Sequence, residues 1–399
     1  MRAIKILQQT ICPFLGFIHA TRLNAVLWAV RSLLFGGRLS LTALGRSGAG
    51  SAFPKHAIKR VDRLLGNKKL HGQIPEFYKL VARMLIGGRR RPIILVDWTV
   101  IGTKHIALVA TVPLDGRSLP IYLEVHPKRK DNNPKVIRRF LRVLEDILPN
   151  KCSPVLVTDA GFKNTWFTEV ASLGWDFVGR VRSNPLVRNL IDPRWHPSQN
   201  LYAQATNRAR DLGRWLLAFS NPRALRLVVI KKHVREKLAK LSGTVMRKKA
   251  IKRAWEPWLL ATSLENVAAK RIVDIYSKRM QIEEPFRDAK NHRFGWSFED
   301  ARSNSAKRFE VLLLISTLGM LAVTLLGHAA ETRGIHRRYQ ANTISTRRVL
   351  SLFYLGCALI RMSEDKSFTR GDFLASLREL RKKLPCVEPT AKSFFVGIP

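Results

Sequence analysis

The chain is short of acidic residues, of cysteine, and of apolar runs long enough to cross a membrane. Asp and Glu supply only 29 of its 399 residues, against 70 Lys and Arg, so the net charge is +41. Such a charge makes the folded chain repel itself unless a polyanion offsets it, and nucleic acid is the obvious polyanion. We therefore expect a nucleic-acid partner, and neither a membrane nor a small-molecule substrate.

Cysteine spacing excludes a disulfide framework and a structural zinc site. The four cysteines lie far apart at positions 12, 152, 357 and 386, with no CxxC pair, and the ten histidines show no zinc-ligand spacing. This usage is typical of a reducing cytosol. The N-terminal segment lacks the apolar core and cleavage site of a secretory signal, so we expect a cytoplasmic protein.

The longest uncharged run, VLLLISTLGMLAVTLL at 311–326, is slightly short for a membrane span. It predicts instead a buried helix that covers a sheet. No internal repeat or low-complexity tract is present.

Residues 1–90 form a helical, basic region with a helix–turn–helix-like segment at 40–66. Ser40 is a suitable N-cap for the first helix, and Pro54 suits the first turn of the second. One side of the second helix carries the basic residues Lys55, His56, Lys59, Arg60 and Arg63. This helix fits a DNA reader, and it fits equally an amphipathic helix with a basic solvent face.

A mixed sheet is predicted beyond residue 90, because the apolar period changes there. Strands are expected at 93–96, 105–112, 118–126, 155–157 and 175–182, and helices at 134–148 and 164–173. This order suits an α/β or α+β sheet with helices against its faces. The core would comprise 91–184 and 257–330.

The stretch 185–256 interrupts the core. It holds a strand-like run at 225–230 and then a basic segment, which we predict to be a flexible, phosphate-contacting insertion rich in β-structure. Its cations are Lys231, Lys232, Arg235, Lys237, Lys240, Arg247, Lys248, Lys249, Lys252 and Arg253.

The region 331–399 is helical again. Thr369 and Asp372 resemble a capping box. The leucines at 374, 377, 380 and 384 form a stripe that suits either the core or a protein–protein contact, such as dimerisation.

Two carboxylates follow apolar strands: Asp97 ends IILVD and Asp159 ends VLVTD. A carboxylate there costs free energy unless it is paired or binds a cation. The alternative for Asp159 is the start of a turn, because Ala160 and Gly161 follow. With Glu283, three carboxylates would suit Mg²⁺, and two such ions can clamp an in-line phosphoryl displacement.

The segment YSKRMQIEEPFRDAK (276–290) places four functional side chains at helical intervals. In one α-helix, Tyr276, Arg279, Glu283 and Lys290 would share an arc of roughly 60° along ~21 Å. Arg279 and Lys290 would hold DNA phosphates, and Tyr276 would donate a hydrogen bond to another. The alternative is a solvated face with an Arg–Glu pair.

Two further residues of this segment qualify the helix prediction. Pro285 lacks a backbone donor, so the helix either kinks near 281–285 or is locally distorted. Glu284 is the rival carboxylate. It would lie about 100° around the helix from Glu283, and we expect it to pair with a surface cation.

Together these motifs resemble the DDE transposases of bacterial insertion sequences, in the cut-and-paste group with the YREK signature. The spacing Y-x2-R-x3-E-x6-K is met in full within 276–290. LVDW at 95–98, DAGF at 159–162 and RLLGN at 63–67 match further family motifs. The similarity runs from about residue 20 to 360, and the joint match is far more specific than any one motif.

The resemblance implies a ribonuclease-H-like core in which Asp97, Asp159 and Glu283 bind two Mg²⁺ ions, with Mn²⁺ as a substitute. It implies a β-strand insertion between Asp159 and Glu283. It also implies a homodimer that pairs the terminal inverted repeats of double-stranded DNA and joins them to target DNA, near the bacterial nucleoid. Strand nicking, hairpin closure, hairpin opening and strand transfer would follow one another in a single site.

By resemblance, Trp258 stacks on a flipped base during hairpin formation, and Met280 is a second base contact. The alternative for Trp258 is a core tryptophan on a strand. Two other functions share parts of the pattern. A related nuclease or resolvase would cleave without joining strands, and an inert basic nucleic-acid-binding protein would not need the three acids.

Overall fold

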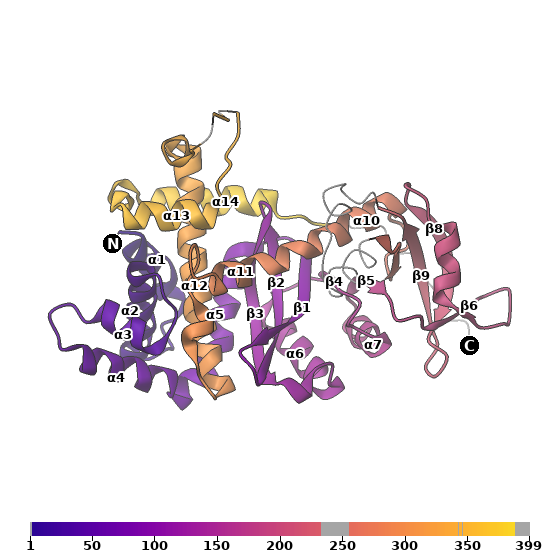
Figure 1. Ribbon diagram of the computed structural model, residues 1–399, viewed down its shortest axis with the longest axis horizontal. Coiled ribbons are helices and arrows are strands. Elements are labelled where there is room, and N and C mark those ends of the chain that lie inside the picture. Colours follow the sequence, from indigo (N-terminus) through magenta and orange to yellow (C-terminus); the bar gives the residue numbers. More distant parts are fainter. Residues whose placement is uncertain (1, 233–254, 342, 345, 388–399) are drawn as a thin grey trace, which may run out of the picture. The chain divides into compact units, whose positions relative to one another are not determined.

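The computed structural model describes residues 2–232, 255–341, 343–344 and 346–387, and the chain divides into two units (Figure 1). The first unit comprises Met1–Arg89, Asp97–Cys152 and Gln281–Pro385. The second comprises Arg90–Val96, Ser153–Met280 and Cys386–Pro399. Most of the predicted phosphate-contacting cations fall outside the described residues, namely Arg235, Lys237, Lys240, Arg247, Lys248, Lys249, Lys252 and Arg253.

Helices fill the N-terminal part of the first unit. They are α1 (Arg2–Ile11), α2 (Ala20–Gly36), α3 (Leu41–Gly48), α4 (Pro54–Leu65) and α5 (Lys68–Ile86). As predicted, Ser40 caps α3 by accepting a hydrogen bond from Ala43 N at 3.4 Å, and Pro54 opens α4. The segment 40–66 is therefore two helices joined by a turn, and α4 buries Val61 and Leu64.

The first unit also holds the hairpin of β2 (His105–Leu114) and β3 (Arg117–Pro127), beside which lies β1 (Ile93–Ile101). The hairpin turns at Asp115 and Gly116, whose φ angles of 48° and 81° are left-handed. Helix α6 (Pro134–Ile147) covers the hairpin with its predicted apolar face, and Phe140 stacks on Tyr122 of β3 with ring centroids 4.9 Å apart.

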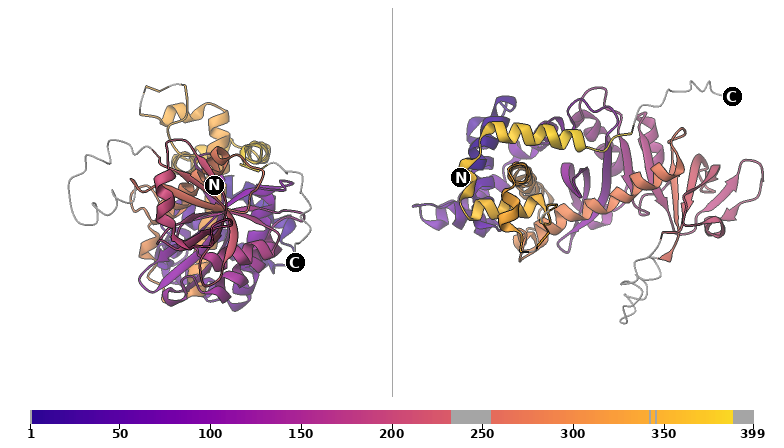
Figure 2. Two further views of the ribbon diagram at one scale, coloured as in Figure 1. Left: turned by 90° about the vertical axis from the view of Figure 1, so that its right-hand side faces the viewer. Right: turned by 90° about the horizontal axis from the view of Figure 1, so that it is seen from above.

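The apolar run forms α12 (Ala306–Thr332), which packs against β3, α2 and α13 (Leu352–Arg361). The right-hand view of Figure 2, which is seen from above, shows α12 nearly end-on with α13 and α14 beside it. In the described part of the chain it alone is long and apolar enough to cross a membrane, yet its apolar window is entirely buried in the protein. The prediction of a buried helix against a sheet is confirmed.

Two glycines allow α12 and α13 to touch through their backbones. A Cβ on Gly356 would lie 2.0 Å from the Val323 carbonyl oxygen, and one on Gly327 would lie 2.1 Å from that of Leu352. Any side chain at either position would push the two helices apart.

Beyond α13 come the short 3₁₀ segments Ile335–Tyr339 and Glu364–Ser367, and then α14 (Arg370–Lys383). The predicted capping box of Thr369 and Asp372 is present. Of the leucine stripe, Leu377, Leu380 and Leu384 are buried in the core, whereas Leu374 is 37% exposed.

The second unit is built on parallel strands followed by antiparallel ones. Residues 93–96 of β1 pair in parallel with β4 (Val155–Thr158), and β4 pairs in parallel with β5 (Asp176–Val181). Helix α7 (Asn164–Ser172) connects β4 to β5. The order of three strands, helix, strand, helix and strand is as predicted.

The strands of the interruption extend this sheet. They are β6 (Leu186–Asn189), β7 (His196–Pro197), β8 (Arg210–Leu217) and β9 (Arg223–Ile230). A 3₁₀ turn, Ser198–Gln204, lies among them. Strand β10 (Trp258–Thr262) pairs with β5 on one side and with β9 on the other. The insertion and the core of the second unit thus share one ladder of backbone hydrogen bonds.

Candidate active site

Asp97 lies where strand β1 leaves the core. The preceding residues Ile93–Val96 are buried, and Asp97 itself is half-buried. The strand does not end there, as the sequence suggested, but continues to Ile101. The carboxylate accepts a hydrogen bond from the Trp98 backbone N–H at 2.8 Å, which fixes its orientation at the strand.

Asp97 and Glu283 line the same cavity of about 390 Å³ in the first unit. One wall comes from β1 and the other from the segment that ends at Lys290. The full lining is Asp97, Trp98, Thr99, Ile282, Glu283, Phe286, Arg287 and Lys290. Two predicted carboxylates and one predicted phosphate contact therefore open onto one space.

Lys290 joins the two walls. Its ammonium donates a hydrogen bond to the Val100 carbonyl oxygen of β1 at 2.9 Å. Burial lowers the pKa of Lys290, and the nearby Glu299 opposes that shift. A partly buried ammonium of this kind is suited to bind a phosphate, because the phosphate oxygens would accept hydrogen bonds from the remaining N–H groups of Lys290.

The predicted helix 276–290 is interrupted. Helix α10 (Ala269–Ser277) carries Tyr276, a 3₁₀ segment (Lys278–Ile282) carries Arg279, and α11 (Glu283–Lys290) begins at Glu283. The single arc calculated for one α-helix therefore does not describe these four residues, since 3₁₀ geometry advances each residue by a larger angle. Pro285 sits in the first turn of α11, where its missing N–H leaves no hydrogen bond broken.

Asp159 belongs to the second unit and directly follows β4. Its Oδ1 accepts a hydrogen bond from the Gly161 backbone N–H at 2.7 Å, the turn that the sequence offered as an alternative. A Cβ on Gly161 would lie 3.0 Å from that oxygen and crowd the carboxylate. Phe162 is buried against Trp166, with ring centroids 4.7 Å apart, and anchors the turn.

Register aligns the first two acidic motifs. Val96 of β1 is the partner of Thr158 of β4 in the parallel ladder. Each of these residues is followed directly in the chain by a predicted metal ligand, Asp97 and Asp159. The pairing of Val96 with Thr158 thus sets the register between the ends of the two apolar runs.

Tyr276 is 4% exposed rather than set on an open face. Burial raises the pKa of its phenol; Arg279 and Arg180 lower it, and Asp159 raises it. Tyr276 thus lies close enough to Asp159 for that carboxylate to affect its phenol. Burial also lowers the pKa of the Arg180 guanidinium.

Trp258 lies half-buried on β10 beside Tyr276, with ring centroids 4.8 Å apart in an edge-to-face contact. The Lys232 ammonium stands 4.2 Å from the centroid of the indole and donates to Ser277 Oγ at 2.7 Å. Met280 is 54% exposed, and its sulfur is 3.4 Å from an Arg279 nitrogen. Trp258 is therefore neither a fully buried core residue nor an open platform.

The segment 88–320, more than half of the chain, matches the family model described as the transposase DDE domain. The chain belongs to this family. The transposase is accordingly an enzyme of DNA phosphoryl transfer, and enzymes of this family generally use divalent metal ions. Its mixed α/β sheet with flanking helices agrees with the expected ribonuclease-H-like fold. No curated protein sequence matches it.

Carboxylates are the candidate metal ligands of the transposase. Within residues 2–232 and the described part beyond 254, no three His, Cys, Asp or Glu side chains gather closely enough to hold a metal ion. Asp97 and Glu283 nonetheless present oxygen donors to one cavity, the donor type that Mg²⁺ prefers. These two residues fit such an ion, and the three-carboxylate set stays a prediction.

The N-terminal basic residues of the transposase are exposed on α4. Lys55, Lys59, Arg60 and Arg63 all face solvent. Arg60 also covers the Trp28 ring, with 4.3 Å between its guanidinium carbon and the centroid, and Lys59 pairs with Asp62 at 3.3 Å. The helix has the buried apolar side and the exposed basic side that either prediction required.

Sequence reasoning missed the partners that hold α11. Glu284 pairs with a cation as predicted, but its main partner is Arg117 at 2.6 Å, with Arg287 at 2.8 Å. Asp288 was not singled out, although it also pairs with Arg117, at 3.0 Å. Burial raises the pKa of Asp288 to about 6 in spite of Arg117. No local pattern marks Arg117, which stands 167 residues before Glu284.

Proposed function

We propose that the chain is a cut-and-paste transposase of the YREK group, similar to the transposase of the tetracycline-resistance composite transposon. The proposal is supported above all by the cavity that Asp97, Glu283 and Lys290 share in a chain of the transposase DDE domain family. The complete Y-x2-R-x3-E-x6-K spacing adds to it. We place its action in the bacterial cytoplasm, at the nucleoid.

Asp97, Asp159 and Glu283 would hold Mg²⁺, two ions per site, or Mn²⁺ in its place. Such ions supply Lewis-acid stabilisation of the attacking and leaving oxygens. Lys290 holds a phosphate oxygen at the mouth of the cavity, because its charge is fixed there by the Val100 carbonyl. Arg279 would bind a neighbouring phosphate, and the Tyr276 hydroxyl would donate a hydrogen bond to another.

Four phosphoryl transfers would use this one site. Water attacks the phosphorus at the element end, and the leaving 3′ oxygen becomes a hydroxyl. That hydroxyl attacks the phosphorus of the opposite strand, closes a hairpin and releases the flanking 3′ oxygen. Water reopens the hairpin, and the regenerated 3′-hydroxyl attacks target DNA. Each step exchanges one P–O bond for another, so the same residues serve all four.

Hairpin closure bends the strand sharply, and Trp258 would relieve the bend by stacking on a flipped base. The Lys232 ammonium covers one face of the Trp258 indole. A base that stacked on this face would displace the ammonium, which could then bind the adjacent phosphate. Met280 has an exposed thioether and would contact the position in the DNA that the flipped base has left.

The DNA partners are the terminal inverted repeats and the target duplex. The exposed Lys55, Lys59, Arg60 and Arg63 of α4 would contact an element end. The two ends would be paired by a homodimer in a synaptic complex. Neither a membrane nor a small-molecule substrate is part of the proposal.

The test uses purified full-length protein, Mg²⁺ and labelled DNA that carries the sequences flanking its own gene. Products are separated on a denaturing gel beside those of Glu283→Gln and of a control, Glu145→Gln, which removes a partly exposed carboxylate of α6. We expect a Mg²⁺-dependent hairpin and joined products with the wild type and the control, and none with Glu283→Gln. Nicks without hairpins or joined products would instead favour the nuclease. Binding without cleavage would contradict the catalytic proposal for this DNA.

A further inference from the structure

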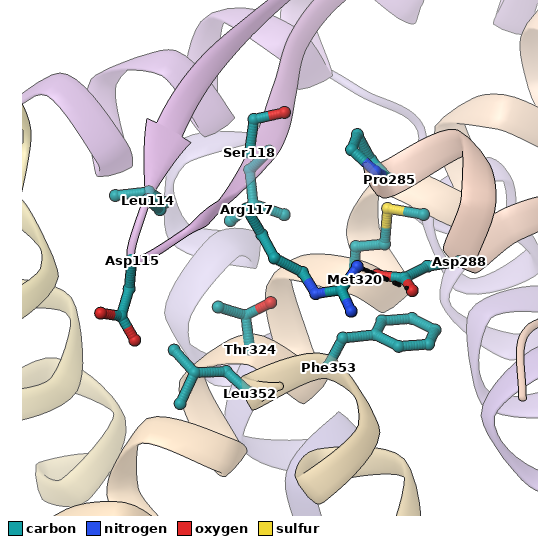
Figure 3. Close-up of a pocket in the computed structure, with 11 residues that line it drawn as sticks. Leu114, Asp115, Arg117, Ser118, Pro285, Asp288, Met320, Thr324, Leu352 and Phe353 are labelled. Carbon is teal, nitrogen blue, oxygen red and sulfur yellow. Dashed lines mark hydrogen bonds and ion pairs between the residues drawn. The ribbon is translucent and has the colours of Figure 1, made fainter. Parts of the chain in front are cut away.

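Helix α11 carries acidic residues on two sides. Glu283 lines the cavity that Asp97 shares, whereas Asp288 lines a second, small cavity beneath the β2–β3 hairpin. Figure 3 shows Arg117 reaching from the start of β3 toward Asp288, with Met320 and Phe353 beside the pair. The two sides of α11 therefore have different partners.

Arg117 bridges successive turns of α11. Its Nη1 donates to Glu284 Oε2 at 2.6 Å and to Asp288 Oδ1 at 3.1 Å. The next residue of β3, Ser118, donates through Oγ to the Gln281 carbonyl oxygen at 2.9 Å. Two consecutive residues of β3 thus hold the chain on both sides of Glu283, two residues before it and from one residue after it.

The helix has little means to hold itself in place. It is eight residues long and follows a 3₁₀ segment. The N-cap residue, Ile282, makes no side-chain cap. Isolated helices of this length are unstable in water, so tertiary contacts must set the position of α11.

The bridge is shielded from solvent. The side chains of Arg117, Glu284 and Asp288 are 30%, 20% and 13% exposed. Apolar side chains, among them Pro285, Met320 and Phe353, surround Arg117 and Asp288. Removing the guanidinium would leave Asp288 without this ion pair and Glu284 with Arg287 alone, so the bridge from β3 to the two carboxylates of α11 would be lost.

We propose that Arg117 is a positioning residue for Glu283: by holding Glu284 and Asp288, it fixes the face of α11 that presents Glu283 beside Asp97. The inference rests on the proposed role of Glu283. Arg117 itself does not line the shared cavity. It acts as an outer partner that orients a ligand without touching the reacting atoms.

The test compares full-length Arg117→Gln and Arg117→Lys with a matched control, Arg348→Gln. Arg348 is likewise a shielded arginine of the first unit, with a side chain 12% exposed, that pairs with two carboxylates, Asp115 and Glu331. It makes no contact with α11 among those the described residues show. Measured quantities are the single-turnover cleavage rate, the Kd for element-end DNA, the melting temperature, and Mn²⁺ affinity by calorimetry without DNA.

For Arg117→Gln we expect cleavage and Mn²⁺ affinity to fall about 10- to 100-fold, with DNA affinity unchanged. Arg117→Lys should recover part of the loss, because the lysine ammonium keeps the positive charge near Glu284 and Asp288 but lacks the planar fork of the guanidinium. Arg348→Gln should lower the melting temperature and leave cleavage unchanged. Equal loss of cleavage in both glutamine variants would overturn the proposal, because it would signify a general loss of stability.

A second variant keeps the test decisive if Arg117→Gln does not fold. Glu284→Gln with Asp288→Asn removes both partners and their mutual repulsion, and the same loss of cleavage is expected; wild-type cleavage would overturn the proposal. Glu283→Gln, assayed in parallel, separates the two failures. If it is inactive while Arg117→Gln is fully active, only the positioning role falls. If it cleaves normally, both proposals fall.

Discussion

The Lys290 ammonium and the Val100 carbonyl oxygen are joined by a 2.9 Å hydrogen bond, and Lys290 lines the same cavity as Asp97 and Glu283. The ammonium has three N–H donors, and Val100 accepts from one of them, so a phosphate that binds there can accept from the other two. The phosphate contact proposed for Lys290 gives a direct prediction.

Lys290→Ala should weaken binding to element-end DNA and reduce the slope of log K against log salt by about one. The measurement is fluorescence anisotropy at several salt concentrations. Lys382→Ala, which removes an exposed lysine from the last turn of α14, is the control and should leave specific binding unchanged. An unchanged slope for Lys290→Ala would show that this lysine touches no phosphate.

Asp97→Asn and Glu283→Gln should each abolish nicking while retaining the affinity for element ends. Both substitutions preserve side-chain volume and remove the charge that a divalent cation requires. The test is a nicking assay beside a binding assay at equal protein concentration. Full activity of either variant would remove that residue from the active site.

Trp258→Ala should leave the first nick intact and impair hairpin closure. A flipped base loses its stacking surface, which is worth about 1 to 3 kcal/mol per base in other DNA-binding proteins. Trp258→Phe retains a ring and should restore part of the hairpin yield. If Trp258→Ala lost both steps equally, its edge contact with Tyr276 would be the reason, and the role would be structural.

Asp288 should make the protein less stable as pH rises through the range 4 to 6. Burial raises its folded pKa to about 6, above the ordinary value of 3.8, so the folded state binds the proton more tightly. Stability from this group is complete below the unfolded pKa and is lost as pH rises to the folded one. Between pH 5 and 7.5 the wild type should lose about 1 kcal/mol relative to Asp288→Asn in urea unfolding. Parallel pH dependences would contradict this.

Gly356→Ala should destabilise the protein by about 1 to 3 kcal/mol, because its methyl group would overlap the Val323 carbonyl of α12. Gly72→Ala is the control. Gly72 lies exposed within α5 with open space where a Cβ would stand, so alanine should stabilise by about 0.5 to 1 kcal/mol. Thermal unfolding of the two variants measures both effects, and equal shifts would argue against backbone contact between the helices.

Local patterns in the sequence predicted most of the fold. Apolar periodicity placed β2, β3, α6 and the buried α12, since each buries a face that its spacing already displays. Capping residues fixed the starts of α3 and α14. The pairing of Asp97 with Glu283 at one cavity followed from the joint motifs, and from neither residue alone.

Long-range contacts escaped prediction. Nothing near Arg117 in the sequence indicates that it holds Glu284 and Asp288. Pro285 signalled an irregular helix but not the 3₁₀ segment before Glu283. The continuation of β1 past Asp97 was missed because its half-buried residues lack the apolar run that marked the strand.

The shared ladder of the second unit has a mechanical consequence. Peptide hydrogen bonds run without a break from the insertion strand β9 through β10 and β5 to β4, whose last residue precedes Asp159. Because these four strands pair continuously, a displacement of β9 must either break backbone hydrogen bonds or carry β10, β5 and β4 with it. The position of the Asp159 turn is therefore coupled to that of the insertion strand.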